Sequence, residues 1–302
     1  MDKKLKLLTD KKQQLDTFRP LPPELVVNLD EWFKVELTYT SNAIEGNTLT
    51  RAETALVVEK GITIQGKSLK EHLEATNHVE ALDYIKTLVS KKRQDLRELD
   101  ILEIHKAILQ KIEENHAGRY RTQHARLTGS ETVLPNPVKV PDLMKTFINW
   151  LTGNNSDHPV KVAADAHFKL VTIHPFSDGN GRTSRLLMNL LLMQAGYPPA
   201  IIRKEDRLEY VNALEKGQVG NDIGDFYYLI YEAVDRSLDI YLEALQPDQR
   251  FYTTDEVARL LKVDPESVRR YVRSHKLRAV RLGGKFIRIE KADLDKFIEQ
   301  LK

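Results

Sequence analysis

Residues 174–185, HPFSDGNGRTSR, place a glycine turn between two helix-forming segments and so constrain the fold around them. Pro175 ends the helical pattern before it, because proline cannot continue the hydrogen-bond ladder and pushes the preceding residue out of the α region. Gly179 and Gly181 permit a tight turn. The residues that follow, TSRLLMNLLLMQAG, have the pattern of a helix that ends at Gly196. The stretch therefore predicts two consecutive helices separated by a sharp turn.

The start of the second helix is a predicted phosphate site. The first amides of a helix lack intrahelical acceptors and lie at the positive end of its dipole, so the backbone of Gly179, Asn180 and Gly181 can approach an anion closely. Arg182 and Arg185 are three residues apart, which places both guanidinium groups on one helix face. Planar guanidinium groups bind phosphate oxygens through paired donors.

Two further side chains of the stretch suggest a reaction. His174 can take up a proton near neutral pH, and Asp178 is a hard oxygen ligand for a Mg²⁺ ion that bridges phosphates. Together with the phosphate site they predict transfer from a nucleotide to a hydroxyl group. The alternative is a loop with a structural histidine followed by a glycine-capped helix.

The whole string resembles the Fic family motif H-x-F-x-D/E-G-N-G-R-x-x-R, and every fixed position is filled. This resemblance implies an α-helical Fic domain that transfers AMP from ATP to a Ser, Thr or Tyr hydroxyl of a protein, including the chain itself, and releases pyrophosphate. His174 is the implied base. Transfer of another group, such as UMP or phosphocholine, stays open because a phosphate cradle does not read the base, and so does removal of AMP. A different alternative is a DNA-binding regulator that only senses nucleotide.

An amphipathic helix is predicted over about 28–46, ending at Gly46. Ser41 and Glu45 are four residues apart and share a face in its last turns. A glutamate there lies at the unfavourable end of the helix dipole, so a cationic partner would explain its position. The pattern S/T-x-x-x-E-G/N resembles the inhibitory motif of Fic proteins of the second class. It implies that Glu45 pairs with Arg185 and keeps the site inactive; the alternative is a solvent-exposed glutamate.

Residues 61–68, GITIQGKS, match the P-loop pattern G-x-x-x-x-G-K-S/T. A P-loop follows a buried strand of a parallel sheet, and the chain shows no alternation of strands and helices. Gly61 is better explained as a helix C-cap and Ser68 as the N-cap of the next helix, which leaves Lys67 exposed.

A short β-hairpin flap is predicted over 126–134, with a turn at Gly129 and Ser130 and with prolines 135 and 137 blocking its extension. A lone hairpin in a helical domain has an open edge that can offer backbone donors and acceptors to an extended partner chain. In the Fic family a hairpin flap at the matching place orients the target. A plain solvent-exposed loop is the alternative.

The predicted domains are a Fic domain over 1–248 and a winged helix-turn-helix over 249–302. Net charge is +2 for the chain, but basic residues exceed acidic ones by six in 250–302, which suggests a polyanionic partner. The segment resembles small excisionase- and MerR-like DNA-binding domains, and a protein-docking module is the alternative. Five residues are candidate DNA contacts, namely Ser267, Arg269, Arg270, Arg273 and Lys285.

Composition limits the remaining classes. Of 302 residues, 41% are hydrophobic and 30% charged, the balance of a soluble globular protein. The chain has no cysteine, which excludes disulfides, zinc-thiolate sites and cysteine nucleophiles. No apolar run approaches membrane-spanning length, and the charged N-terminus lacks the apolar core of a signal peptide. These features predict a cytoplasmic enzyme with no membrane partner.

Overall fold

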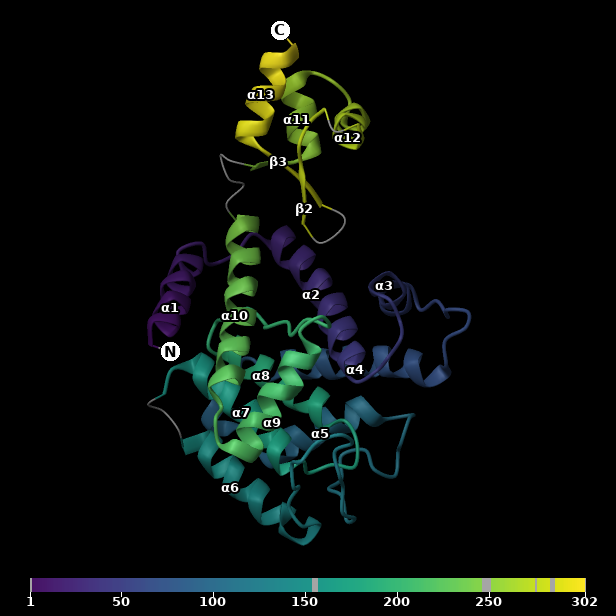
Figure 1. Ribbon diagram of the computed structural model, residues 1–302, viewed down its shortest axis with the longest axis vertical. Helices are drawn as coiled ribbons and strands as arrows, with labels where there is room; N and C mark the ends of the chain where they lie inside the picture. Colours follow the sequence, from purple (N-terminus) through teal and green to yellow (C-terminus); the bar gives the residue numbers. More distant parts are fainter. Residues whose placement is uncertain (1, 154–156, 246–250, 275, 283–285, 302) are drawn as a thin grey trace. The chain divides into compact units, whose positions relative to one another are not determined.

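The computed structural model describes residues 2–153, 157–245, 251–274, 276–282 and 286–301. Contacts divide the chain into two compact units, Met1–Tyr241 and Leu242–Lys302. Helices dominate both units (Figure 1), which confirms the predicted all-α fold class. The expected boundary after residue 248 lies outside the described residues and stays a prediction.

The first unit consists of helices joined by short connections. In chain order, the elements through the last long helix are α1 (Asp2–Asp16), α2 (Pro23–Ile44), α3 (Arg51–Lys60), α4 (Leu69–Thr87), the 3-10 turn η1 (Arg93–Asp95), α5 (Glu98–Leu109), the 3-10 turn η2 (Pro137–Lys139), α6 (Val140–Gly153), α7 (Pro159–Ile173), α8 (Asn180–Gln194), α9 (Arg207–Gly220) and α10 (Gly224–Leu245). No strand occurs among the described residues of this unit, which argues against the P-loop alternative.

Helix α8 forms the centre of the first unit. It packs most extensively against α7 and also contacts α2, α4 and α5. Its apolar side chains, such as Leu187 and Leu190, are almost fully buried. A helix buried on all sides is expected to be apolar all round, yet Arg182 and Arg185 in its first turns are also buried. Two buried cations at one end of a core helix require specific partners.

Helix ends in the N-terminal half follow the sequence signals. Capping boxes begin α3 at Thr50 and α4 at Ser68, and Gly61 ends α3 in the left-handed region with φ 62°. The expectation of an exposed Lys67 is wrong. Its Nζ donates to the carbonyl of Thr48 at 2.6 Å, and its side chain is 19% exposed, because the short loop folds back on the preceding connection.

The predicted hairpin over 126–134 has its turn but not its strands. Ser130 N donates to Leu127 O at 3.3 Å, whereas no strand is assigned to either arm. The N–H of Glu131, which would take part in a ladder, donates instead to Glu215 of α9. An isolated pair of three-residue strands is marginal in water, so side-chain contacts decide the conformation here.

The second unit has the expected helix-turn-helix and wing. Its elements are β1 (Phe251–Tyr252), α11 (Thr254–Leu261), α12 (Pro265–Arg273), β2 (Val280–Leu282), β3 (Phe286–Glu290) and α13 (Lys291–Leu301). The strands form an antiparallel sheet in the order β1-β3-β2, so β1 adds a strand to the predicted pair. Val257, Val268, Leu277, Ile289 and Phe297 form its buried core.

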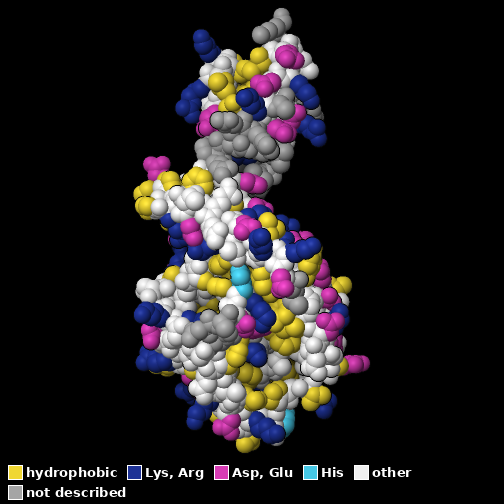
Figure 2. Space-filling model, turned by 90° about the vertical axis from the view of Figure 1, so that its left-hand side faces the viewer, with side chains coloured by type: hydrophobic (Ala, Val, Ile, Leu, Met, Phe, Trp, Pro, Cys, Tyr) yellow, Lys and Arg dark blue, Asp and Glu magenta, His cyan; other side chains and the backbone are white. Residues whose placement is uncertain are grey.

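The surface of the described residues mixes charged and apolar side chains. Figure 2 shows apolar side chains gathered on one face of the first unit, with Lys, Arg, Asp and Glu distributed around them. None of the helices in the described ranges combines the length and the apolar character needed to cross a membrane. No group of three metal-ligating side chains occurs among these residues either.

Candidate active site

His174 lies at the end of α7, where it adopts the left-handed conformation with φ 49° and ψ 58°. Its Nδ1 is 3.3 Å from Val171 O, so the Nδ1–H tautomer donates to this carbonyl and leaves the Nε2 lone pair available. Burial lowers the pKa of His174 from its ordinary value, and nearby Arg121 lowers it further. The imidazole is therefore neutral at neutral pH and can accept a proton at Nε2.

The loop after His174 is held by its own side chains. Asn180 accepts from Phe176 N at 3.0 Å and donates to Phe176 O at 2.9 Å, so its side chain shapes the turn. Gly179 takes the left-handed N-cap conformation with φ 75°. Asn180, expected to bind phosphate, thus contributes its backbone N–H to the start of α8, together with that of Gly181.

Asp178 projects beside this helix start. One carboxylate oxygen accepts from Gly179 N at 2.6 Å and the other lies 3.2 Å from Arg182 Nη2, while the side chain is 42% exposed. Burial alone would raise the pKa of Asp178, but Arg182 and the Gly179 N–H hold it below its ordinary value. An ionised, accessible carboxylate suits Mg²⁺, which takes one or two carboxylates and completes its shell with water and phosphate oxygens.

Arg182 is 2% exposed and lies between two carboxylates. Besides Asp178, its Nη1 is 3.4 Å from Glu74 Oε1, and Glu74 Oε2 accepts from Asn47 Nδ2 at 2.9 Å. The Nε and Nη1 atoms of Arg182 make no hydrogen bond in the structure. Buried donors without acceptors are costly, and phosphate oxygens would satisfy them.

Arg185 joins the motif to the end of α2. Its Nε donates to Ser41 Oγ at 3.0 Å, its Nη2 donates to Glu45 Oε1 at 2.7 Å, and its Nη1 donates to Tyr210 OH at 3.3 Å. Burial would lower the pKa of Arg185, but Glu45 and Tyr210 raise it, so the guanidinium stays charged. The structure therefore brings Glu45 to Arg185, the pair that the resemblance implied, and adds a contact between Ser41 and Arg185 that was not predicted.

Glu45 occupies the space in front of the predicted phosphate cradle. It is the C-cap of α2, whose last carbonyl, that of Ile44, accepts from Arg207 Nε at 2.6 Å. A Cβ atom added to Gly181 would lie against Glu45 Oε1, closer than real side chains approach, and 3.0 Å from Arg185 Nη1. Only glycine at 181 leaves room for this carboxylate.

His105 supports the loop between His174 and α8 and was not predicted. Its Nδ1 accepts from Gly118 N at 3.0 Å, so its Nε2–H donates to Asp178 O at 3.0 Å, and its ring stacks on Phe176 with centroids 3.6 Å apart. Burial lowers the pKa of His105 to about 4, which keeps the ring neutral. A lone histidine in an apolar helix pattern carries no signal that could have identified it.

Tyr210 and His167 extend the network behind Arg185. Tyr210 OH lies 3.0 Å from His167 Nε2, and burial lowers the pKa of His167 to about 3. His167 is therefore a buried, neutral histidine that packs behind the Arg185 network.

The candidate DNA contacts of α12 are mostly engaged within the helix. Ser267 donates from N and Oγ to Asp264, which is the helix N-cap. Arg269 and Arg273 both pair with Glu266, and Arg270 Nη2 lies 3.3 Å from Ser267 Oγ. The second unit carries Lys and Arg side chains interspersed with acidic ones (Figure 2). Lys285 lies outside the described residues.

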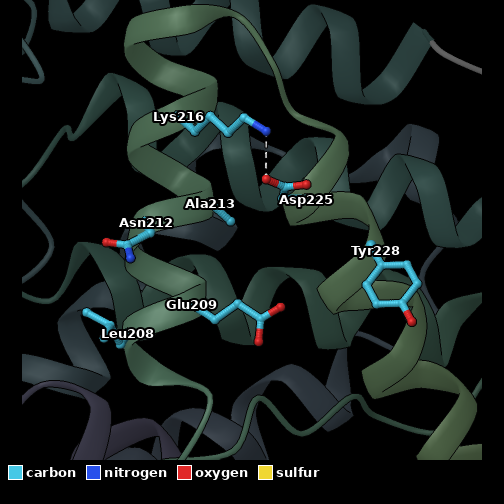
Figure 3. Close-up of a pocket in the computed structure, with 7 residues that line it drawn as sticks. All are labelled: Leu208, Glu209, Asn212, Ala213, Lys216, Asp225 and Tyr228. Carbon is cyan, nitrogen blue, oxygen red and sulfur yellow. Dashed lines mark hydrogen bonds and ion pairs between the residues drawn. The ribbon is translucent and has the colours of Figure 1, made fainter.

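Two cavities lie away from the motif. One of about 390 Å³ lies between α9 and α10 (Figure 3). It is lined by Leu208, Glu209, Asn212, Ala213, Lys216, Asp225 and Tyr228. The other, of about 550 Å³, lies beside α2 and the end of α8. Neither is lined by a motif residue.

A neutral histidine, an ionised aspartate, the amides at the start of α8 and two buried arginines lie together on one helical scaffold, and such groups can bind phosphate and accept a proton. The chain belongs to the Fic family. Residues 95–192 match the Fic/DOC family, and residues 251–302 match the family described as helix-turn-helix domain.

The relatives agree with this membership. The chain is 42% identical over 206 residues to a protein adenylyltransferase Fic of Nematostella vectensis and 43% identical over 212 residues to one of Aedes aegypti. These alignments cover 68% and 70% of this chain but 48% and 42% of the relatives, so the chain spans less than half of their length.

Solved structures give the same answer. The fold resembles Fic-1 (residues 134–508) of C. elegans with a TM-score of 0.74 and 33% identity, over 81% of this chain and 72% of that one. A Fic domain containing signaling protein of Bacteroides thetaiotaomicron matches with a TM-score of 0.72 and 32% identity, over 82% of this chain and 99% of that one.

Proposed function

We propose that this chain transfers AMP from ATP to a Ser, Thr or Tyr hydroxyl of a protein. The observation that carries the proposal is the geometry of His174, whose Nδ1 is bound to Val171 O while Nε2 is left as a base next to the start of α8. The names of the curated relatives, protein adenylyltransferase, support it.

In the proposed reaction, Nε2 of His174 takes the proton of the acceptor hydroxyl as its oxygen attacks the α-phosphorus of ATP. The bond between this phosphorus and the bridging oxygen to the β-phosphate breaks, and pyrophosphate leaves. The amides at the start of α8 and the guanidinium groups of Arg182 and Arg185 balance the phosphate charge. Asp178 would hold Mg²⁺, which would supply positive charge to offset that of the phosphates.

Glu45 is proposed to inhibit this reaction. It pairs with Arg185 at 2.7 Å and fills the space over Gly181, where a phosphate would have to lie. ATP could then bind only with its terminal phosphates displaced. Ser41 holds the Nε of Arg185 in the orientation that favours this pair.

Labelled ATP with Mg²⁺ tests both proposals. Glu45→Gly should incorporate label into protein faster than wild type, and a Glu45→Gly/His174→Ala double variant should incorporate it about 10²–10⁴-fold more slowly than Glu45→Gly. Label from UTP but not ATP would support transfer of another nucleotide. Loss of label from pre-modified protein in wild type would favour removal of AMP instead.

A second proposal concerns residues 250–302, for which duplex DNA is the proposed partner. The match to a helix-turn-helix family and the excess of six basic residues support it. The test is binding of the full chain to duplex DNA at increasing salt. DNA binding predicts salt-sensitive affinity that is lost when the arginines of α12 are neutralised, whereas a protein-docking role predicts no such binding.

A further inference from the structure

The flap, residues 126–134, is fixed to the first unit at its base by Arg121. This side chain is 6% exposed. It donates to the carbonyls of His174 at 2.8 Å, Gln123 at 3.0 Å and Pro135 at 2.6 Å. One buried guanidinium therefore joins the proposed base to the segments that enter and leave the flap.

The flap is fixed a second time at its turn. Glu215 Oε1 of α9 accepts from Ser130 Oγ at 2.7 Å and from Glu131 N at 2.6 Å. These hydrogen bonds lower the pKa of Glu215, and the bond from Ser130 has the larger effect, so the carboxylate is ionised at neutral pH. Hydrogen bonds to a charged acceptor are stronger than those between neutral groups.

A third connection continues toward the proposed base. Thr132 Oγ1 donates to Gln218 Oε1 at 3.0 Å, and Gln218 Nε2 donates to Thr172 Oγ1 at 3.2 Å. Thr172 is two residues before His174 on the last turn of α7. Side chains of α9 thus link the flap to the helix that carries the proposed base.

The outer arm of the flap remains open. Val133 is 92% exposed, and within the described ranges no acceptor is found for the N–H groups of Val133 and Leu134. An extended chain can pair with such an edge through its backbone, whatever its side chains are. The distance of that chain from the base then depends on how firmly the flap is held.

We propose that Glu215 is a positioning residue, whose carboxylate clamps the turn of the flap on α9 so that its open edge holds the acceptor chain at a fixed place relative to His174. The inference rests on the proposed AMP transfer. Glu215 makes no contact with the motif, so its loss should weaken acceptor binding and leave the steps on ATP unaffected. A flap that is already held in its binding conformation binds the acceptor chain more tightly, because less conformational freedom is lost on binding.

Hydrogen exchange of the Glu131 amide tests the clamp without requiring any activity. In the full chain, Glu215→Ala should remove protection of this amide, and Glu215→Gln should retain most of it, because the amide oxygen of glutamine can still accept both hydrogen bonds. Glu209→Ala is the matched control. Glu209 lies on the same helix and extends into the groove toward α10 (Figure 3), so its removal should leave the flap protected. Equal protection in wild type and Glu215→Ala would overturn the clamp.

Transfer between two chains tests positioning. A Glu45→Gly chain serves as enzyme, and a tagged His174→Ala chain, which cannot label itself, serves as acceptor at increasing concentration. Adding Glu215→Ala to the enzyme should raise the KM for the acceptor about tenfold with kcat nearly unchanged, the loss expected for about two hydrogen bonds. Glu215→Gln should restore the KM.

The outcomes separate the two proposals. A loss of exchange protection with an unchanged KM would overturn the positioning role, and an equal fall of kcat in the Ala and Gln variants would do the same. If no chain becomes labelled although Glu131 loses protection in Glu215→Ala, the proposed AMP transfer fails while the clamp stands.

Discussion

The arginines of α8 and those of α12 are the same side chain in opposite environments. Arg182 and Arg185 are at most 5% exposed, and each is placed by two or more named partners. On α12, the side chains of Arg269 and Arg273 are 47% and 62% exposed and share Glu266. Buried charges need partners because removing them from water is costly, whereas an exposed ion pair contributes only about 0–1 kcal/mol to the stability of the fold. Buried arginines therefore locate a site, and exposed ones alone do not.

The largest expected effect tests whether the buried region is catalytic. His174→Ala, in a Glu45→Gly background, should lower the rate of AMP transfer by about 10²–10⁴, because the general base is lost while the groups that bind ATP remain. Initial rates of label incorporation measure the transfer, and calorimetric titration with ATP measures the binding. His124→Ala, at an exposed histidine, is the control and should match its parent. Full transfer by His174→Ala would break the assignment.

The next effect concerns the partner of Arg185. Glu45→Gly should raise AMP transfer about ten- to a thousandfold. The Glu45–Arg185 pair stabilises the inactive state, and each ~1.4 kcal/mol of stabilisation that is lost raises the fraction of chains able to bind ATP productively about tenfold. Ser41→Ala should give a smaller rise, because it removes one hydrogen bond to Arg185 and keeps the ion pair. Label incorporation at fixed Mg²⁺ is the measurement. Equal rates in Glu45→Gly and wild type would show that the buried pair does not regulate the site.

A pH titration sharpens the comparison through burial. The pKa of His105 is lowered from 6.5 to about 4, so as the pH falls the unfolded chain binds a proton at this residue at a higher pH than the folded chain does. The neutral His105 contributes fully to the free energy of unfolding above about pH 6.5. This contribution falls as the pH falls toward 4, by on the order of 3 kcal/mol in total. His105→Gln should lower the Tm at pH 7 and flatten its fall between pH 7 and 4. Parallel Tm curves for the two chains would contradict the buried neutral state of His105.

The smallest effect belongs to the exposed region. Arg270→Ala should reduce the slope of log affinity for duplex DNA against log salt by about one unit, the value for one phosphate contact. Arg269→Ala should change it less, because Arg269 already pairs with Glu266. Arg259→Ala on α11, which bonds its own helix backbone, is the control. An unaltered slope in Arg270→Ala would favour the docking alternative for this unit.

Much of the site followed from local patterns. The motif at 174–185 combines proline, glycine and charged residues whose effects act within one or two turns, so the helix, turn and arginine positions could be predicted. The Glu45–Arg185 pair was also predicted, although 140 residues separate its members. The position of Glu45 at a helix C-terminus indicated only some cationic partner, and the resemblance to the Fic inhibitory motif implied Arg185.

The supporting residues could not be predicted from the sequence. His105, Arg121 and Tyr210 act through contacts with distant backbone or side chains, and no spacing in the chain announces these contacts. The flap strands failed for a related reason. The turn at Gly129 and Ser130 between two short segments predicted a ladder, but Glu215, 84 residues from Glu131, accepts a hydrogen bond from the Glu131 amide instead. Local propensity is a weak guide wherever a single tertiary contact competes with it.

Under the proposed inhibition, Glu45 at the end of α2 and the nucleotide compete for the space over Gly181. Because Glu45 and a terminal phosphate cannot occupy it together, their binding is linked, and linkage is reciprocal. A partner that binds the end of α2 and moves it, for example by breaking the contact between Arg207 and Ile44, would raise the affinity for ATP by some factor. Bound ATP would then raise the affinity for that partner by the same factor, although the two ligands do not contact each other.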